Sequence, residues 1–294
     1  AIEIQDITKY TKAEILRYNL IDALATFYIW EKYHEETLSR PYLEIFQPSL
    51  YTLIKMMLVG LPMDSDRVQE VHTILTAKEK VLNEQIQEND YVITFNDVLQ
   101  TDACEKANTR LKKLVKTIDE FEDIKFNPSS HPQLAKLLFE TLNLPVLDKT
   151  KSGAPATSAD VLKDLENHTT DIDILDLLKF VRDLSEVCKI NGTFIKAFMQ
   201  EKDFLHGNLK LGGTQSGRLA SNSPNLTNLP AHGSMGKLVK SCIIAPDGWL
   251  FAGADFSALE ERVGAILSKD PNRIKVYTDG YDGHSLRAQT YFAD

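Results

Sequence analysis

Apolar residues recur at helical spacing through most of the first two hundred residues, and this periodicity constrains the fold more than any other feature of the sequence. One stripe runs from Ile15 to Tyr33, and a second runs from Leu50 to Leu58 before Gly60 and Pro62 interrupt it. Amphipathic stripes of this kind predict helices that bury one face and expose the other. The N-terminal part of the chain is therefore predicted to be helical.

A longer helix is predicted after Asp64 or Ser65, either of which can cap its start. Its apolar face consists of Val68, Val71, Leu75, Leu82 and Ile86. We expect this helix and the preceding one to lie back to back and form an antiparallel arm. Ser130 and Gln133 have the spacing of a capping box ahead of a further helix. Another helix is predicted over residues 174–198.

Basic side chains gather on the helix that follows the polar far end of this arm. They are Lys106, Arg110, Lys112, Lys113 and Lys116. A basic tip on an extended arm can follow a phosphate backbone. The alternative is an ordinary solvated face, because Asp and Glu are interleaved with these lysines.

The character of the sequence changes after Lys202, where glycines and prolines break the helical pattern and indicate loops or short strands. We place a boundary near residue 203 between a helical part and an α/β part. The apolar run Trp249–Ala254 predicts a buried strand, and helical spacing returns from Ser257 onward. Such a strand would carry Asp255 at its end, facing a cleft.

Composition favours a soluble globular protein. The 294 residues are 43% hydrophobic and 26% charged, enough to bury one or two ordinary cores. No run approaches the roughly eighteen apolar residues of a membrane span, and the first residues lack a signal-peptide pattern. The cytoplasm is therefore the expected location, without a membrane partner. Three widely spaced cysteines, Cys104, Cys188 and Cys242, offer neither a disulfide framework nor a zinc knuckle.

The net charge of −9 argues against a nucleic-acid binder when taken globally. Its distribution argues otherwise, because no Asp or Glu occurs between His206 and Pro246. The basic residues of this stretch are Lys210, Arg218, Lys237 and Lys240. It is a local electropositive island that suits a polyanion, or a polar loop region that happens to lack acids.

Asp255 is the strongest candidate for chemistry. A carboxylate beside the backbone carbonyl of Phe256 presents hard oxygen ligands of the kind that Mg²⁺ prefers. An aspartate at the end of a strand is otherwise an ordinary cap or turn residue. The context of the motif therefore decides between these interpretations.

Three ordered segments supply that context. They read TQSGRLASNSPNLTNLP at 214–230, DFSALEER at 255–262 and DGHSLRA at 282–288. This set resembles the family A DNA polymerases, whose patterns are T-x-T/S-G-R-L-S-S-x-x-P-N-L-Q-N-I-P, D-Y/F-S-x-I/L-E-x-R and D-x-H-x-x-T/x-A. Segments 126–133 and 149–158 look like the thumb base of that family, and YNLID at 18–22 is similar to the motif that closes its 3′–5′ exonuclease domain.

The resemblance implies an α+β fold, with a helical thumb and the N-terminal part of a palm antiparallel sheet. It implies a division into the end of an exonuclease-like domain (1–40), the thumb (41–203) and the first part of the palm with its metal-binding motif (204–294). Residues 90–123 are longer than the compact bacterial pattern and suggest an insertion.

The resemblance also assigns roles in nucleotidyl transfer. Asp255 would be one of the two palm carboxylates that bind a pair of Mg²⁺ ions, with the Phe256 carbonyl beside it. Glu260 would pack against the sugar of the incoming nucleotide and disfavour a 2′-hydroxyl, with Ser257 in the same nucleotide-facing motif. His284 would contact the phosphates. Two alternatives remain, a Ser257–Glu260 capping box and a surface histidine in a turn.

For DNA, the resemblance points to Arg218, Asn225 and Asn228 at the minor groove, where acceptors recur in every pair. Lys237 and Lys240 would act as phosphate-directed charges. Asparagine in a proline-flanked loop is otherwise a turn former, which competes most at Asn222. Ala220 and Thr227 replace the usual Ser and Gln, which changes the expected detail of groove contact.

Tyr18 and Asp22 would be the orienting phenol and a metal-binding carboxylate of a proofreading site. A tyrosine and an aspartate one helical turn apart on a surface are the alternative. The sequence lacks the other exonuclease segments expected before Tyr18.

The family also needs a finger helix and a second palm carboxylate, and the sequence stops at Asp294 before either. We therefore expect that this chain alone neither extends primers nor excises nucleotides. Its expected partners are primer-template DNA, a deoxynucleoside triphosphate, and a second polypeptide or missing C-terminal segment that completes the site. A non-catalytic DNA-binding or interaction module and an unrelated helical scaffold are the alternatives. The host would be a bacterial or phage-infected cell.

Overall fold

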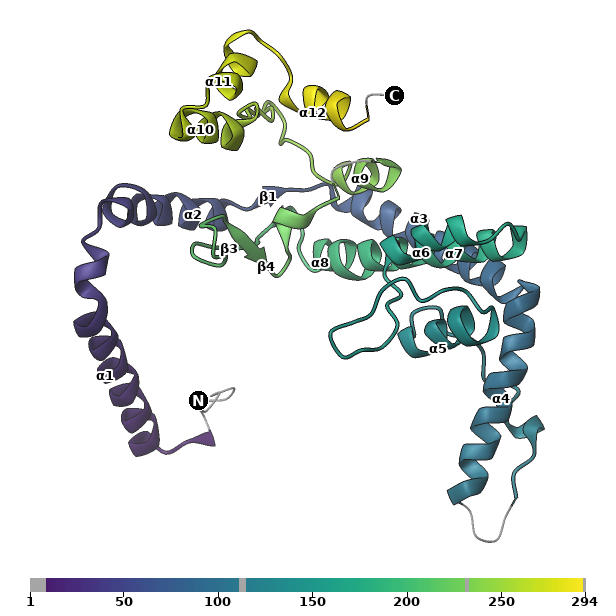
Figure 1. Ribbon diagram of the computed structural model, residues 1–294. Helices are drawn as coiled ribbons and strands as arrows, with labels where there is room; N and C mark the ends of the chain where they lie inside the picture. The colour runs from purple at the N-terminus through teal and green to yellow at the C-terminus, as the bar shows by residue number, and fades with distance from the viewer. Residues whose placement is uncertain (1–8, 111–114, 231–232, 293–294) are drawn as a thin grey trace. The chain divides into compact units, whose positions relative to one another are not determined.

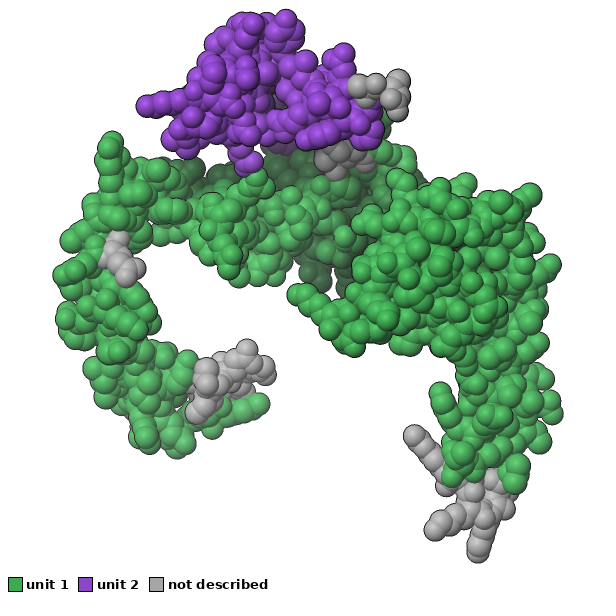
Figure 2. Space-filling model, in the orientation of Figure 1, with its two compact units in different colours: residues 1–244 green, residues 245–294 purple. Residues whose placement is uncertain are grey.

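The computed structural model describes residues 9–110, 115–230 and 233–292. The chain divides into two compact units, residues 1–244 and 245–294 (Figure 2). The first unit contains most of the helices and both small sheets, and the second contains three short helices (Figure 1). The α+β class expected from the sequence is confirmed.

The first two predicted helices form. Helix α1 (Lys12–Thr37) starts with reciprocal hydrogen bonds, because the Thr11 amide donates to the Glu14 carboxylate and the Glu14 amide donates to the Thr11 hydroxyl. The apolar stripe of α1 is exposed to solvent. After the π-helical turn η2 (Tyr42–Phe46), helix α2 (Gln47–Val59) ends at Gly60, whose φ of 75° suits glycine.

Helix α3 (Ser65–Gln87) is capped by Asp64, whose carboxylate accepts a hydrogen bond from the Arg67 amide at 2.9 Å. The expected antiparallel arm of α2 and α3 is wrong, because α3 packs along α7 (Ile172–Lys189) instead. Asn89, beyond the end of α3, donates to the Asp173 carbonyl, whereas His72 in its first half bonds Asn191 beyond the end of α7. The two helices are therefore antiparallel.

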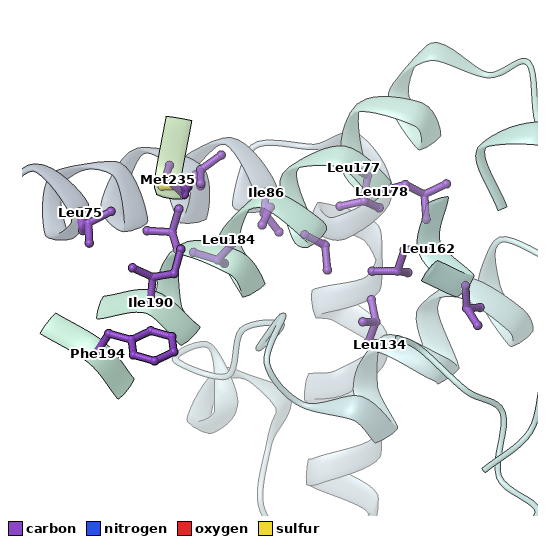
Figure 3. Packing of buried hydrophobic residues seen from close by; sticks show 14 of the residues in the cluster. Leu75, Ile86, Leu134, Leu162, Leu177, Leu178, Leu184, Ile190, Phe194 and Met235 are labelled. Atoms are coloured by element: carbon purple, nitrogen blue, oxygen red, sulfur yellow. The ribbon is translucent and has the colours of Figure 1, made fainter. Parts of the chain in front are cut away.

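One hydrophobic core joins most of the first unit, from Met63 to Cys242 (Figure 3). Leu75 and Ile86 of α3 and Leu177 and Leu184 of α7 all belong to it. Around this pair lie helices α5 (His131–Ala135), α6 (Ala159–Leu165) and α8 (Lys196–Phe198), with the turns η4 (Lys136–Thr141), η5 (Glu166–His168) and η6 (Ile190–Ile195). The helix predicted over residues 174–198 is thus confirmed, with a π-helical stretch near its end.

The capping box expected at Ser130 does not form. Ser130 is the N-cap of α5, but its side chain makes no cap hydrogen bond. The Gln133 side chain instead accepts from the Asn127 amide at 2.8 Å. The Asn127 amide thus takes the oxygen that a capping box would use.

Helix α4 (Asp90–Arg110) and the segment that returns from it form a projecting hairpin. The returning segment contains the 3₁₀ turn η3 (Ile118–Phe121) and runs back along α4 to Phe126. Lys112 and Lys113 of the predicted basic tip lie outside the described residues. Lys116 was expected on the helix but lies beyond the end of α4, where it pairs with Glu120 at 3.3 Å.

Two short antiparallel sheets complete the first unit. Strand β1 (Leu61–Pro62) pairs with β2 (Phe204–Leu205), and β3 (Asn208–Lys210) pairs with β4 (Ala220–Asn222). The 3₁₀ turn η7 (Leu226–Asn228) and helix α9 (Gly233–Lys240) follow. The second unit holds α10 (Leu259–Ser268), α11 (Pro271–Thr278) and α12 (Gly283–Tyr291).

Candidate functional site

The strand predicted at Trp249–Ala254 is wrong. These residues form no strand, and the side chains of Trp249, Leu250 and Phe251 are 73%, 92% and 59% exposed. A strand needs a neighbour to receive its backbone hydrogen bonds, and within the described ranges none pairs with this segment. Asp255 therefore lies in an extended, solvent-exposed segment, with Phe256 exposed beside it. Its carboxylate is accessible and not enclosed in a core.

Helix α10 begins just beyond this carboxylate. Its N-cap is Ala258, in a left-handed conformation with φ of 50°, and no side chain caps it. The Ser257–Glu260 capping box is therefore wrong, because the helix starts one residue later than that box requires. The turn is held instead by Arg262, whose Nε donates to the Ser257 carbonyl at 2.9 Å. Glu260 lies exposed in the first turn of α10.

His284 lies exposed in the first turn of α12 and not in a loop turn. Asp282 caps this helix by accepting hydrogen bonds from the Ser285 amide at 3.0 Å and the Ser285 hydroxyl at 2.6 Å. These bonds lower the pKa of the Asp282 carboxyl below its ordinary value. The DGHSLRA segment thus presents the histidine at a firmly capped helix start.

The residues predicted to contact DNA lie in the first unit, on and after the β3–β4 hairpin. Arg218 is in the exposed connection between the two strands, and its carbonyl accepts a hydrogen bond from Thr214 at 2.8 Å. Asn228 is exposed in η7. Lys237 and Lys240 are exposed on one side of α9, opposite its buried residues Met235 and Val239. The acid-free stretch therefore displays its charges to solvent.

Ser221 is the centre of a hydrogen-bond network that sequence reasoning missed. Its buried hydroxyl donates to Asn225 Oδ1 and accepts from the Thr227 amide, at 3.1 and 2.9 Å. Thr227 also donates to Asn225 Oδ1, at 2.8 Å. The oxygen of Asn225 is thus used within the loop, as a turn former would use it, and its amide group remains as the donor. The departure of Thr227 from the family pattern is the sequence signal for this network.

A cavity of about 570 Å³ lies beside this loop in the first unit. Its polar wall includes Thr193, Gln200, His206, Asn222 and Asn225. The cavity is open and lined by donors and acceptors, so it suits a hydrated polar ligand better than an apolar one.

Tyr18 and Asp22 come together on α1, as their spacing predicts. The Asp22 carboxylate raises the pKa of Tyr18 by its charge and by accepting the phenol hydrogen bond. Among residues 9–110, 115–230 and 233–292, three or more His, Cys, Asp or Glu side chains nowhere gather as a metal site.

None of the helices that the structure describes is both long enough and apolar enough to cross a bilayer.

Comparison with known proteins identifies the family. A model of the DNA polymerase family A sequences matches residues 98–294, and the chain belongs to this family. It is 33% identical over 193 residues to DNA polymerase I of Bacillus subtilis and 35% identical over 173 residues to the thermostable DNA polymerase I of Thermus aquaticus. These matches cover 64% and 57% of this chain, but only 21% and 20% of the relatives.

The chain thus spans about a fifth of the length of these curated relatives. Among solved structures, the POL domain of Pol1 from M. smegmatis, in complex with DNA primer-template and dNTP, has a TM-score of 0.65 at 24% identity. The match covers 87% of this chain and 39% of that one. At this identity the likeness establishes a shared fold, and the residues of the site are argued separately below.

Proposed function

We propose that this chain is the primer-template-gripping region of a template-directed DNA polymerase and contributes Asp255 to two-metal nucleotidyl transfer. The observation that carries the proposal is the DFSALEER segment in a family A chain, with Asp255 accessible immediately before α10. A metal-dependent transfer site needs a carboxylate that an ion can reach.

For the metal, the Asp255 carboxylate and the Phe256 carbonyl are hard oxygen donors that fit Mg²⁺, which takes few protein ligands and keeps several waters. When bound, a metal pair activates the primer hydroxyl and neutralises charge on the triphosphate. The exposed Asp255 carboxylate would provide one negatively charged ligand to these ions. One carboxylate cannot hold two such ions against water, so the site requires the second palm carboxylate and the finger helix from another segment or polypeptide.

For the nucleotide, we assign Ser257, Glu260 and His284, all in the second unit. Glu260 is in the first turn of α10 and His284 in the first turn of α12. His284 is exposed at its position on α12, as a contact to triphosphate requires. Glu260 would then lie against the sugar and disfavour a 2′-hydroxyl.

For DNA, we assign Arg218, Asn225 and Asn228 to the minor groove and Lys237 and Lys240 to phosphates. The Ser221 network supports the assignment of Asn225, because it occupies the side-chain oxygen and leaves the amide donor for groove acceptors. The helix α9 lysines are exposed on one face, where point charges can approach a backbone.

Location and proofreading complete the proposal. A polymerase of this kind works in the cytoplasm of a bacterial or phage-infected cell. The contact between Tyr18 and Asp22 supports an exonuclease remnant in α1, since these two groups already interact. We expect the chain alone to be inactive in both extension and excision.

A primer-extension assay tests the proposal. The chain is combined with the polypeptide or segment that supplies the fingers and the remaining palm, and Mg²⁺ and dNTP are added. Asp255→Ala is expected to lower extension by at least about a thousandfold, because a metal ligand is lost. Asp247→Ala is the matched control, since Asp247 is an exposed aspartate of the same segment, and its effect should stay within about twofold. Equal activity of Asp255→Ala and the wild type would exclude the assigned role.

A non-catalytic DNA-binding module is the second candidate, and the acid-free stretch with its exposed Lys237 and Lys240 favours it. Duplex binding measured against salt concentration tests the interface that both candidates share. Lys237→Gln with Lys240→Gln should reduce the slope of log K against log salt by about 2. Lys163→Gln, on an exposed position of α6, should leave the slope unchanged. Duplex binding with no extension in any combination would favour the module.

A further inference from the structure

Tyr277 of α11 lies where the three helices of the second unit meet. The guanidinium of Arg262, from α10, lies 4.8 Å above the centre of its ring. From α12, a Cβ at Gly283 would lie 3.1 Å from the Tyr277 hydroxyl, tighter than ordinary contact. Glycine at position 283 therefore lets the first turn of α12 pack directly against this tyrosine.

Arg287 of α12 is bound to the same centre. Its Nη2 lies 2.8 Å from the Glu261 carboxylate of α10, and it shares a hydrogen bond with Tyr277. Both contacts raise the pKa of Arg287. The side chains of Glu261 and Arg287 are 35% and 46% exposed, so the pair is partly shielded from solvent. We call Glu261, Tyr277 and Arg287 the helix clamp.

The helix clamp is adjacent to both proposed nucleotide contacts in the second unit. Glu261 follows Glu260 directly on α10, and Arg287 is three residues, or about one turn, beyond His284 on α12. A bond between positions 261 and 287 therefore ties α10 to α12 beside both proposed contacts. A cavity of about 390 Å³ borders the clamp, so the packing between these helices leaves room for them to shift when the bond is lost.

We propose that Glu261 and Arg287 are positioning residues, whose ion pair against Tyr277 holds Glu260 and His284 at the spacing that one incoming nucleotide requires. The inference rests on the proposed function. In the family patterns, position 261 is open and position 287 is the T/x position, so the patterns assign no role to either side chain. Asp255 is not part of the clamp. Loss of the clamp should therefore weaken nucleotide binding and sugar discrimination more than the chemical step.

Steady-state dNTP incorporation by the completed polymerase tests the clamp. Glu261→Gln and Arg287→Gln are each expected to raise the KM for dNTP about threefold to tenfold, with kcat changed less than about twofold. Preference for dNTP over the ribonucleotide should fall to a similar extent. The exchanged variant Glu261→Arg with Arg287→Glu should restore most of the wild-type KM, because the attraction is rebuilt with reversed polarity.

Lys275→Gln is the matched control, since it removes an exposed positive charge from α11 outside the clamp. Single variants that leave KM and discrimination unchanged, or an exchanged variant that folds but does not recover, would overturn the clamp while the polymerase assignment stands. A wild-type protein that incorporates no nucleotide would overturn the polymerase assignment and the clamp with it. A circular dichroism spectrum of each variant separates loss of fold from loss of position.

Discussion

Burial changes the chemistry of Cys242, a fully buried residue beside the first turn of α3. Its carbonyl accepts the Asp64 amide at 2.9 Å, so the same residue also anchors the start of that helix. Desolvation favours the neutral thiol and raises its pKa to about 11, and nearby Arg67 opposes this only in part. Stability linked to this thiol is therefore complete below its ordinary pKa of about 9 and is lost as pH rises toward 11.

We expect Cys242 to resist alkylation in the folded protein. Thiolate is the reactive form, so labelling by iodoacetamide at pH 8 should be slow in buffer and fast in urea. Mass spectrometry of the Cys242 peptide across pH 7 to 11 measures this difference. Rapid labelling at pH 8 without urea would show that the thiol is accessible and its pKa ordinary.

At the scale of elements, one face of α4 binds the chain that returns from its tip. The residues of this face, spaced four apart, are Asn96, Gln100, Cys104 and Asn108. Asn96 accepts from the Phe126 amide at 2.7 Å, and Gln100 donates to the Ile124 carbonyl at 3.2 Å. Asn108 binds both the amide and the carbonyl of Lys116, at 2.7 and 3.0 Å. These side chains satisfy an extended backbone that has no strand partner.

Removal of one of these side chains should loosen the returning segment without unfolding α4. Asn108→Ala deletes the acceptor of the Lys116 amide, a loss of about 1 kcal/mol that should speed hydrogen exchange of that amide about fivefold. Glu105→Ala, on the exposed side of α4, is the matched control and should leave it unchanged. Hydrogen exchange followed by NMR distinguishes the two variants. Equal exchange rates of the Lys116 amide in the wild type and Asn108→Ala would refute the role of Asn108.

The sequence predicts helices correctly where the apolar residues that recur at helical spacing are also the residues that become buried. Helices α3 and α7 follow from their stripes because the same residues form the core, and Asp64 caps α3 as its position predicts. Helix α2 also forms, although most of its apolar stripe is exposed. The hydrogen bonds from α4 to the returning segment could not be predicted. In the sequence, polar residues four apart are indistinguishable from an ordinary solvated helix face.

Predictions that depend on a particular hydrogen-bond partner within the chain were less successful. The apolar run at Trp249–Ala254 reads as a strand, but apolar character supplies no hydrogen-bonding neighbour. Both capping boxes were wrong for local reasons, since Gln133 binds Asn127 and the left-handed Ala258 moves the start of α10. For the site, the sequence identifies Asp255, Glu260 and His284 as candidates, whereas the clamp contacts between them depend on helix packing that no motif records.

At the scale of the whole molecule, the core belongs to the first unit. Its buried cluster runs from Met63 to Cys242, whereas Ala265 is the one buried hydrophobic residue described in the second unit. A unit with so little buried apolar area lacks the driving force to fold alone. The two units should therefore differ sharply in autonomous stability.

A polypeptide of residues 9–244 is expected to unfold cooperatively in urea, with a free energy of unfolding within about 1 kcal/mol of the full chain. A polypeptide of residues 245–294 should show little helix by circular dichroism and no cooperative transition. Collapse of the larger piece would instead mean that the second unit contributes to the first unit's stability.

The small sheet β1–β2 imposes an order on biosynthesis. The Met63 amide donates to the Asp203 carbonyl, and the Ile244 amide donates to the Pro62 carbonyl, so three distant stretches meet at the entrance to α3. Translation delivers the earliest of these stretches long before the latest. The backbone groups of Pro62 and Met63 must therefore stay without these partners until the ribosome has passed residue 244. The entrance to α3 is thus among the last parts of the first unit to close, and this interval is the time when a chaperone can bind there.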